Sequence, residues 1–125
     1  MIYIFSAFYA EAKNIIDHYG LKKEKSPEMV RFDVFVNESI RLVITGVGEI
    51  NAAAAVSNIG GAYGISPDDE ILNVGCGAGF SSDICLGSIF LGNKLTEQMT
   101  GRTFYPDMLM NANFRECEIV TVARA

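Results

Sequence analysis

The 125-residue chain is 50% hydrophobic and 20% charged, a composition typical of one globular domain and unlike that of disordered or fibrous proteins. Its formal net charge of -5 argues against a nucleic-acid partner, because phosphate binding needs clustered lysine and arginine. No apolar stretch approaches the roughly 18 residues of a membrane span. Met1 leads into "IYIF" without a secretory signal, so we expect a cytoplasmic protein without a membrane segment.

The cysteines and the histidine make a metal site or a disulfide framework unexpected. Cys76, Cys85 and Cys117 are odd in number and form no CxxC pair, and His18 is the one histidine. We therefore expect neither a metal nor another cofactor.

The first third of the chain predicts a strand, a helix and a hairpin. Residues 1–7 form an apolar strand, and residues 8–19 carry an apolar stripe at helical spacing that ends before Gly20. Residues 21–28 are polar and predict a loop. The next two strands are expected at 29–37, where apolar residues alternate, and at 40–46, whose core has no polar face, as in a strand covered on both sides. The helical stripe comprises Phe8, Ala12, Ile15, Ile16 and Tyr19.

The rest of the chain predicts one more helix and three more strands. Residues 47–64 are apolar nearly all round, which predicts a buried helix. Strands are expected at 70–75, 86–95 and 117–123, with a long loop over 96–116. Six strands and two helices favour an α/β fold, with a mixed sheet and flanking helices, in a single domain over residues 1–125. Two helices cannot cover both faces of such a sheet, so either another subunit covers it or the chain is the front part of a longer fold.

Two glycine clusters are candidate ligand sites. "TGVGEINAAAA" joins a strand to a helix and nearly matches a dinucleotide fingerprint, but Asn51 replaces the third glycine and Glu49 places a negative charge where a pyrophosphate would lie. A tight turn is the ordinary alternative to a nicotinamide site. "VGCGAGF" follows a strand and lets the backbone approach a ligand closely. Cys76 has no positive neighbour or resolving cysteine nearby in sequence, which favours a structural or pocket-lining thiol over a redox thiol.

Glu11 is the candidate catalytic carboxylate. It falls in the first turns of the first helix, beyond the C-terminal end of the first strand, and ligands bind at that edge of open α/β sheets. A carboxylate there can polarise a water molecule. The alternative is a solvated side chain that the helix dipole favours.

In this order and spacing, the segments "IYIFSAFYAEAKNII", "LVITGVGEINAAAA", "ILNVGCGAGF" and "LGSIFLGNKL" resemble the nucleoside phosphorylase/nucleosidase superfamily. The resemblance is nearest to its 5′-methylthioadenosine/S-adenosylhomocysteine nucleosidase branch. It implies a phosphorylase/hydrolase-like α/β fold and, as parent activity, hydrolysis of the N-glycosidic bond of a purine nucleoside. It covers about the first 95 residues, and "GVGEINAAAA" and "NVGCGAGF" are its specific parts.

The resemblance also implies roles for single residues. Glu11 matches the carboxylate that orients or activates the attacking water, and Phe8 matches an apolar residue against the ribose. Val47 matches a position lining the pocket for the 5′ substituent. The wall of the nucleoside pocket is matched by Cys76, Gly77 and Ala78. Phe104 and Tyr105 lie where the family places a loop that reaches a partner subunit's pocket, although packing of this loop on its own domain is an equal alternative.

The chain departs from the family at several points. Gly87 and Ser88 stand where the family usually has Gly-Asp, and Cys76 stands where it has serine. "SAFYAEA" lacks the arginine of the phosphorylase branch, which favours water over phosphate as the nucleophile, with a phosphate-using nucleoside phosphorylase as an alternative.

Members of the family are considerably longer than this chain. Their second half supplies a Met-Glu pair for the ribose hydroxyls and an aspartic acid for the purine. The sequence is therefore expected to be the N-terminal half of the fold, incomplete at its C-terminus. A truncated, non-catalytic member that dimerises or binds a nucleoside is a second hypothesis. We expect a homodimer in either case, because the apolar helix and thinly covered sheet would otherwise expose a large patch.

Overall fold

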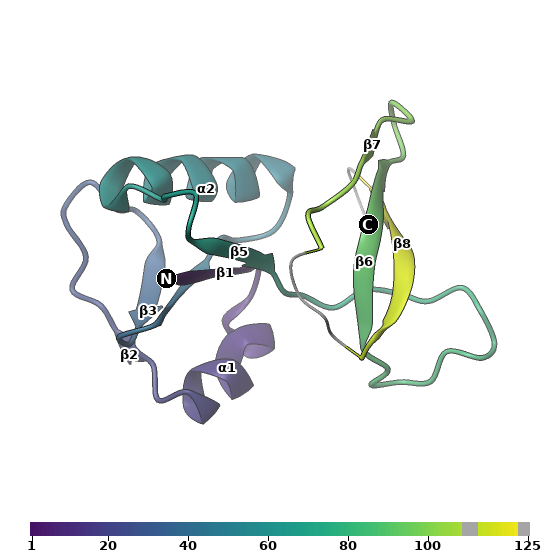
Figure 1. The fold of residues 1–125 in the computed structure, drawn as a ribbon, viewed down its shortest axis with the longest axis horizontal. Coiled ribbons are helices and arrows are strands. Elements are labelled where there is room, and N and C mark those ends of the chain that lie inside the picture. The colour runs from purple at the N-terminus through teal and green to yellow at the C-terminus, as the bar shows by residue number, and fades with distance from the viewer. Residues whose placement is uncertain (109–112, 123–125) are drawn as a thin grey trace. The chain divides into compact units, whose positions relative to one another are not determined.

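The computed structural model describes residues 1–108 and 113–122 (Figure 1). The chain divides into two compact units, Met1–Gly77 and Ala78–Ala125. Two predicted segments reach beyond the described residues: 109–112 of the expected loop and Ala123 of the expected last strand. No helix within the described ranges is long and apolar enough to cross a membrane.

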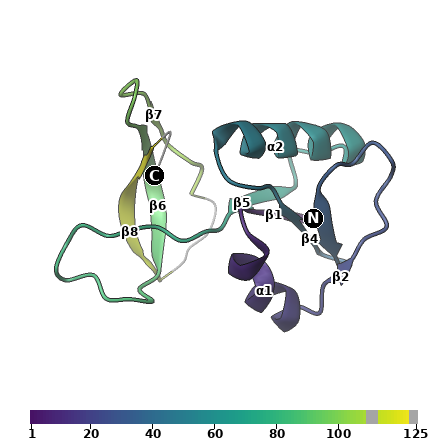
Figure 2. The ribbon, with the colours of Figure 1, turned by 180° about the vertical axis from the view of Figure 1, so that it is seen from behind.

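The first unit is a five-stranded sheet with one helix on each face (Figures 1 and 2). Its strand order is β2-β3-β4-β1-β5, which leaves β5 as an edge strand. In chain order its elements are β1 (Ile2–Ser6), α1 (Tyr9–His18), β2 (Lys22–Lys23), β3 (Asp33–Val36), β4 (Ile40–Ile44), α2 (Glu49–Tyr63) and β5 (Glu70–Asn73).

The sheet is mixed, as the sequence predicts. β1 pairs in parallel with both β4 and β5, so that Ile4 lies opposite Leu42 on one side and Leu72 on the other. β3 and β4 form the predicted antiparallel hairpin. The hairpin turn is closed by Asn37, whose side-chain oxygen accepts hydrogen bonds from the backbone N–H groups of Ser39 and Ile40.

Two apolar cores lie on opposite faces of this sheet, because successive strand side chains point to opposite faces. Leu42 and Val43 are both fully buried, one in each core, which confirms that β4 is covered on both sides. The α2 core contains Tyr3, Phe5, Val34, Val43, Ala55 and Ile59. The α1 core contains Ile4, Ala12, Ile16, Leu21, Ile40 and Leu42.

The prediction that α2 is buried is wrong. Only Ala55 and Ile59 of this helix are buried, whereas Ile50 is 80% exposed and Ala52, Ala53, Ala54 and Val56 are also exposed. The helix touches the sheet along one narrow stripe. Alanine is a strong helix former and tolerates water, so an alanine-rich sequence does not distinguish a buried helix from an uncovered one.

The predicted loops contain short strands that no hydrophobic pattern predicts. β2 lies inside the expected loop 21–28, where Lys22 and Lys23 pair with β3 through the backbone while their side chains stay exposed. The first strand of the hairpin begins only at Asp33 rather than at residue 29. Backbone pairing at a sheet edge needs no apolar side chain, which is why these bounds differ from the prediction.

The second unit is a separate three-stranded sheet rather than a continuation of the first. Its strands are β6 (Phe90–Glu97), β7 (Thr103–Phe104) and β8 (Arg115–Thr121), in the order β7-β6-β8. β6 runs parallel to β8 and antiparallel to β7. The expected loop over 96–116 therefore contains β7, the end of β6 and the start of β8. In the described residues the chain has eight strands in two sheets, not six in one.

A polar cluster ties the loop before β3 to the end of α2. Glu24 pairs with Arg41 at 3.3 Å and accepts a hydrogen bond from the hydroxyl of Tyr63. The Arg41 guanidinium lies 3.8 Å from the centre of the Tyr63 ring. Burial alone raises the pKa of Glu24, but hydrogen bonds from Tyr63 and the charge of Arg41 outweigh it and hold this pKa below its ordinary value of 4.5.

We expect Glu24→Gln to lower the free energy of unfolding at pH 7 by about 1–2 kcal/mol, since hydrogen bonds to a charged group are lost. A carboxyl group whose pKa is lower in the folded state stabilises the fold at pH values above its unfolded-state pKa. This contribution is lost as the pH falls through the folded-state pKa. Urea unfolding between pH 7 and about pH 3 should therefore show a smaller loss of stability in Glu24→Gln than in the parent. Glu28→Gln, at an exposed carboxylate of the same loop, should leave the pH dependence unchanged. Equal slopes for Glu24→Gln and the parent would contradict the assignment.

Candidate functional site

The C-terminal ends of β1, β4 and β5 meet at one edge of the first unit. Beyond the ends of the strands, the backbone N–H of Thr45 donates to the carbonyl of Ser6 at 2.9 Å, and that of Val74 donates to the carbonyl of Phe5 at 2.9 Å. The turn before α2 and the glycine segment after β5 therefore leave the sheet at the same edge as the start of α1. This is the edge at which open α/β sheets bind ligands.

Glu11 is held at this edge by three hydrogen bonds. Its Oε2 accepts from the backbone N–H of Phe8 at 3.2 Å and from the hydroxyl of Ser6 at 3.3 Å. Its Oε1 accepts from the backbone N–H of Cys76 at 3.0 Å. A side chain that only capped its own helix would need no partner beyond α1 and the residue before it. The contact with Cys76, 65 residues further along the chain, joins α1 to the glycine segment after β5.

Because glycine has no side chain, the backbone of the glycine segment lies close to the carboxylate of Glu11. A Cβ atom added to Gly75 would lie 3.7 Å from Oε1 of Glu11, so the carboxylate packs directly over this backbone. The predicted role of the segment, close approach of its backbone to a ligand, stays a prediction. The glycine segment contacts the carboxylate of Glu11 through its backbone and without a charged side chain.

The hydrogen bonds leave the carboxylate able to bind water. An ionised carboxylate has about four acceptor positions on its two oxygens. Two donors occupy Oε2 and one occupies Oε1, so Oε1 keeps a free acceptor position. A water molecule bound there would donate a proton to Oε1 and direct an oxygen lone pair away from the carboxylate, which is the arrangement needed for general-base assistance.

Three more predicted site residues lie in the first unit. Phe8 precedes α1, is 53% exposed and donates the backbone hydrogen bond to Glu11. Cys76 is an exposed free thiol beside the same carboxylate. Gly77 ends the first unit, and a Cβ added there would meet no atom within 4 Å. Val47 lies in the turn between β4 and α2 and is 60% exposed.

The remaining predicted residues belong to the second unit. Ala78 is its first residue, Phe104 lies in β7 and Tyr105 follows it. Both aromatic side chains are exposed, and the Arg102 guanidinium lies 5.5 Å from the centre of the Phe104 ring. Their place in a partner subunit's pocket stays a prediction, as does the function of the whole set of site residues.

Ser6 is a polar contact of Glu11 that the sequence interpretation missed. Ser6 is a single hydroxyl residue after the apolar stretch "IYIF", and one such residue forms no sequence pattern. Within the described ranges no group of three or more His, Cys, Asp or Glu side chains is placed to hold a metal ion.

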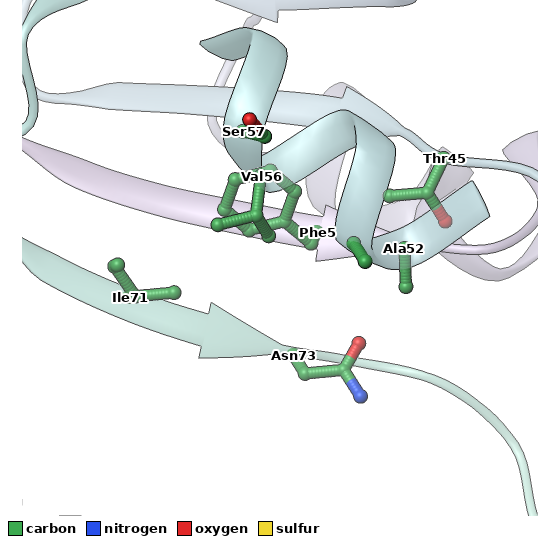
Figure 3. Close-up of a pocket in the computed structure, with 8 residues that line it drawn as sticks. Phe5, Thr45, Ala52, Val56, Ser57, Ile71 and Asn73 are labelled. Atoms are coloured by element: carbon green, nitrogen blue, oxygen red, sulfur yellow. The ribbon is translucent and has the colours of Figure 1, made fainter. Parts of the chain in front are cut away.

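An apolar groove of about 570 Å³ lies on the other face of the sheet, between α2 and the edge strand β5 (Figure 3). Its volume falls in the range of small-molecule sites, but none of the predicted site residues lines it. Glu11 lies on the α1 face, so the groove and the carboxylate are separate features. The groove is lined chiefly by Phe5, Thr45, Ala52, Val56, Ile71 and Asn73.

Comparison with known proteins gives a fold but no close relative. No family model and no curated protein sequence matches the chain. Among solved structures, the 5′-methylthioadenosine/S-adenosylhomocysteine nucleosidase of Neisseria meningitidis, in complex with methylthio-immucillin-A, superposes with a TM-score of 0.77 at 17% identity. A mutant of the Helicobacter pylori MTAN, with 5′-methylthioadenosine in its active site, gives a TM-score of 0.80 at 13% identity. The futalosine hydrolase of Helicobacter pylori gives 0.79 at 14% identity.

These likenesses show that the chain has the α/β fold of the nucleosidases over nearly its whole length, which confirms the fold class expected from the sequence. Each of the three comparisons covers 98% of this chain but 64% of the other. The chain thus spans about two-thirds of the length of the solved nucleosidases that it matches.

Proposed function

We propose that this protein acts on purine nucleosides, with hydrolysis of the N-glycosidic bond as its reaction and Glu11 as the residue that prepares the water. The supporting observation is the carboxylate at the C-terminal edge of the sheet, fixed by Ser6, Phe8 and Cys76 with one acceptor position on Oε1 free. The nucleosidase fold and the nucleosides or analogues named for the solved neighbours support the same substrate class.

In this reaction the water donates a proton to Oε1 of Glu11 as its oxygen bonds to the anomeric carbon. The bond between that carbon and the purine nitrogen breaks, and its electron pair leaves with the purine, which takes up a proton from the solvent. Glu11 then returns its proton to the solvent. Ribosyl transfer of this kind passes through an oxocarbenium-like transition state, so the negative charge of Glu11 also favours the developing positive charge.

We further propose that the nucleoside lies over the glycine segment. Phe8 would contact the ribose, and Val47 would line the space for the 5′ substituent. Cys76, Gly77 and Ala78 would form the wall beside the base. Phe104 and Tyr105 would be contributed by a loop of a second copy. Apolar and backbone contacts of this kind are typical of small-molecule sites, which use few polar groups to fix orientation.

The direct test is an assay of purine release by the full 125-residue chain. Methylthioadenosine, adenosylhomocysteine and inosine are incubated with the protein, and free base is measured by liquid chromatography. Parallel reactions with and without phosphate separate hydrolysis, which yields the free sugar, from phosphorolysis, which yields the sugar phosphate. Release of no base from any of the three nucleosides would contradict the proposed activity.

A non-catalytic nucleoside-binding protein is the second candidate. It is favoured by one observation: no residue predicted here supplies the proton that the departing purine needs. Isothermal titration with methylthioadenosine, combined with the assay of purine release, distinguishes the two candidates, because a non-catalytic protein would bind the nucleoside and release no base.

We also propose that the protein is a homodimer that buries the exposed side of α2. Isolated exposed apolar residues are ordinary, but Ile50, Ala53 and Val56 lie along one helix beside an apolar groove, and contiguous apolar surface marks an interface. Light scattering is expected to give twice the 13.6 kDa mass of the chain. Ala53→Glu should shift the mass to that of the monomer, since it places a charge on this surface, whereas Glu38→Gln should not. A monomeric mass for the unmodified chain would refute the proposal.

The compartment that we propose is the cytoplasm. All three cysteines are free thiols, a state that the reducing cytoplasm maintains.

A further inference from the structure

The side chain of Ser6 is a buried hydroxyl in an apolar core. Ser6 ends β1 on the face of Ile4, because side chains alternate along a strand, and this face is covered by α1. The exposed fraction of Ser6 is 0%. In the described part of the chain, Thr45 is the one other buried polar residue. A hydroxyl in such a place is costly unless it makes a hydrogen bond.

The hydrogen bond of Ser6 goes to the proposed catalytic carboxylate. Its Oγ lies 3.3 Å from Oε2 of Glu11, and since an ionised carboxylate can only accept, the hydroxyl is the donor. The backbone carbonyl of Ser6 is engaged separately, by the N–H of Thr45. The hydroxyl is thus available to Glu11, and packing alone would be served equally well by alanine.

We infer that Ser6 is a positioning residue that determines which oxygen of Glu11 faces the reacting water. With Ser6 and the N–H of Phe8 on Oε2, that oxygen has two donors, while Oε1 has one donor and a free acceptor position. Loss of the hydroxyl leaves Oε2 with one donor, so that the two oxygens become equivalent and the carboxylate can rotate about its terminal torsion. The catalytic meaning of this inference rests on the proposed nucleosidase function, whereas the orientation of Glu11 does not.

The orientation of the Glu11 carboxylate can be tested without an activity assay. The probe is the ¹H–¹⁵N resonance of the Cys76 amide, whose proton points at Oε1. Ser6→Ala is expected to move this resonance upfield, because a rotating carboxylate is a poorer acceptor. In a Glu11→Ala background the same substitution should have no effect, since coupling between two residues disappears when one of them is removed. Thr45→Val is the matched control: it removes a buried hydroxyl that donates to the backbone carbonyls of Ser6 and Gly46, and its effect should be the same in both backgrounds.

The catalytic consequence is tested by steady-state kinetics of purine release. Ser6→Ala is expected to lower kcat on the order of tenfold with KM nearly unchanged, as a misplaced catalytic group does. Ser6→Thr, which keeps the hydroxyl, should restore most of kcat.

The two measurements separate the two claims. If the unmodified chain releases no purine, the proposed function fails, and the Cys76 resonance still decides the role of Ser6. If Ser6→Ala leaves the Cys76 resonance in place, or moves it equally with and without Glu11, the positioning role is overturned, whatever the activity.

Discussion

Replacing Glu11 with glutamine is expected to lower kcat for purine release by about 10²- to 10⁴-fold, the usual contribution of a general base. Glutamine keeps the size of the side chain, but its single carbonyl oxygen can accept from only one of the Cys76 and Phe8 amides. It also cannot take a proton from water at neutral pH. Binding of the nucleoside should change little, because the substitution removes charge at the reacting centre rather than apolar contact surface. Liquid chromatography of the released base gives kcat, and isothermal titration gives the affinity.

Glu38→Gln is the matched control for this experiment. Glu38 is an exposed carboxylate in the turn between β3 and β4, and its substitution removes the same charge without touching the site. We expect its kcat to equal that of the parent. If both glutamine variants are equally active, Glu11 is a helix-capping residue only, and the water must be activated by another group.

Leu42→Ala is expected to lower the free energy of unfolding by about 2–5 kcal/mol, the cost of removing a large aliphatic side chain from a core. Leu42 is completely buried at the centre of β4, where β1 and β3 flank it and the helix α1 packs over it. Little can move in to fill the space, because the neighbouring strand residues are held by the sheet. A loss of this size is a large part of the 5–15 kcal/mol that typically stabilises a domain.

Leu86→Ala provides the comparison, since Leu86 is fully exposed in the second unit. Its substitution should change the unfolding free energy by no more than about 0.5 kcal/mol. Urea denaturation followed by circular dichroism measures both variants. A small effect of Leu42→Ala would mean that the two-layer core of the first unit is looser than its burial indicates.

The elements that carry an apolar pattern were predictable from the sequence. The parallel strands β1, β4 and β5, the helix α1 and the β3–β4 hairpin lie where hydrophobic alternation or helical spacing places them. The two-residue strands β2 and β7 were not predictable, because they are defined by backbone pairing with a neighbouring strand. The exposure of α2 was missed for a different reason: its sequence is apolar on every side, and only the three-dimensional contacts reveal which side is covered.

The sequence predicts which segments lie near one another at the site, but it does not predict the individual side-chain contacts. The positions of Glu11 and of the glycine segment after strands of one parallel set imply a common edge, and the hydrogen bond from Cys76 to Glu11 agrees with it. Ser6 was overlooked because a single hydroxyl at the end of a strand carries no pattern. Its importance depends on a rotamer of Glu11, and rotamers are set by packing across elements rather than by local sequence.

The edge position of β5 has a consequence for how activity would be lost. Oε1 of Glu11 depends on the amide of Cys76, which lies shortly after the end of β5 at Asn73, and β5 is held to the sheet on one side only. Short edge strands detach at a free energy well below that of global unfolding. Mild urea should therefore abolish the proposed purine release while the far-ultraviolet signal of both helices persists, so that a loss of this activity would reflect detachment of one strand rather than global unfolding.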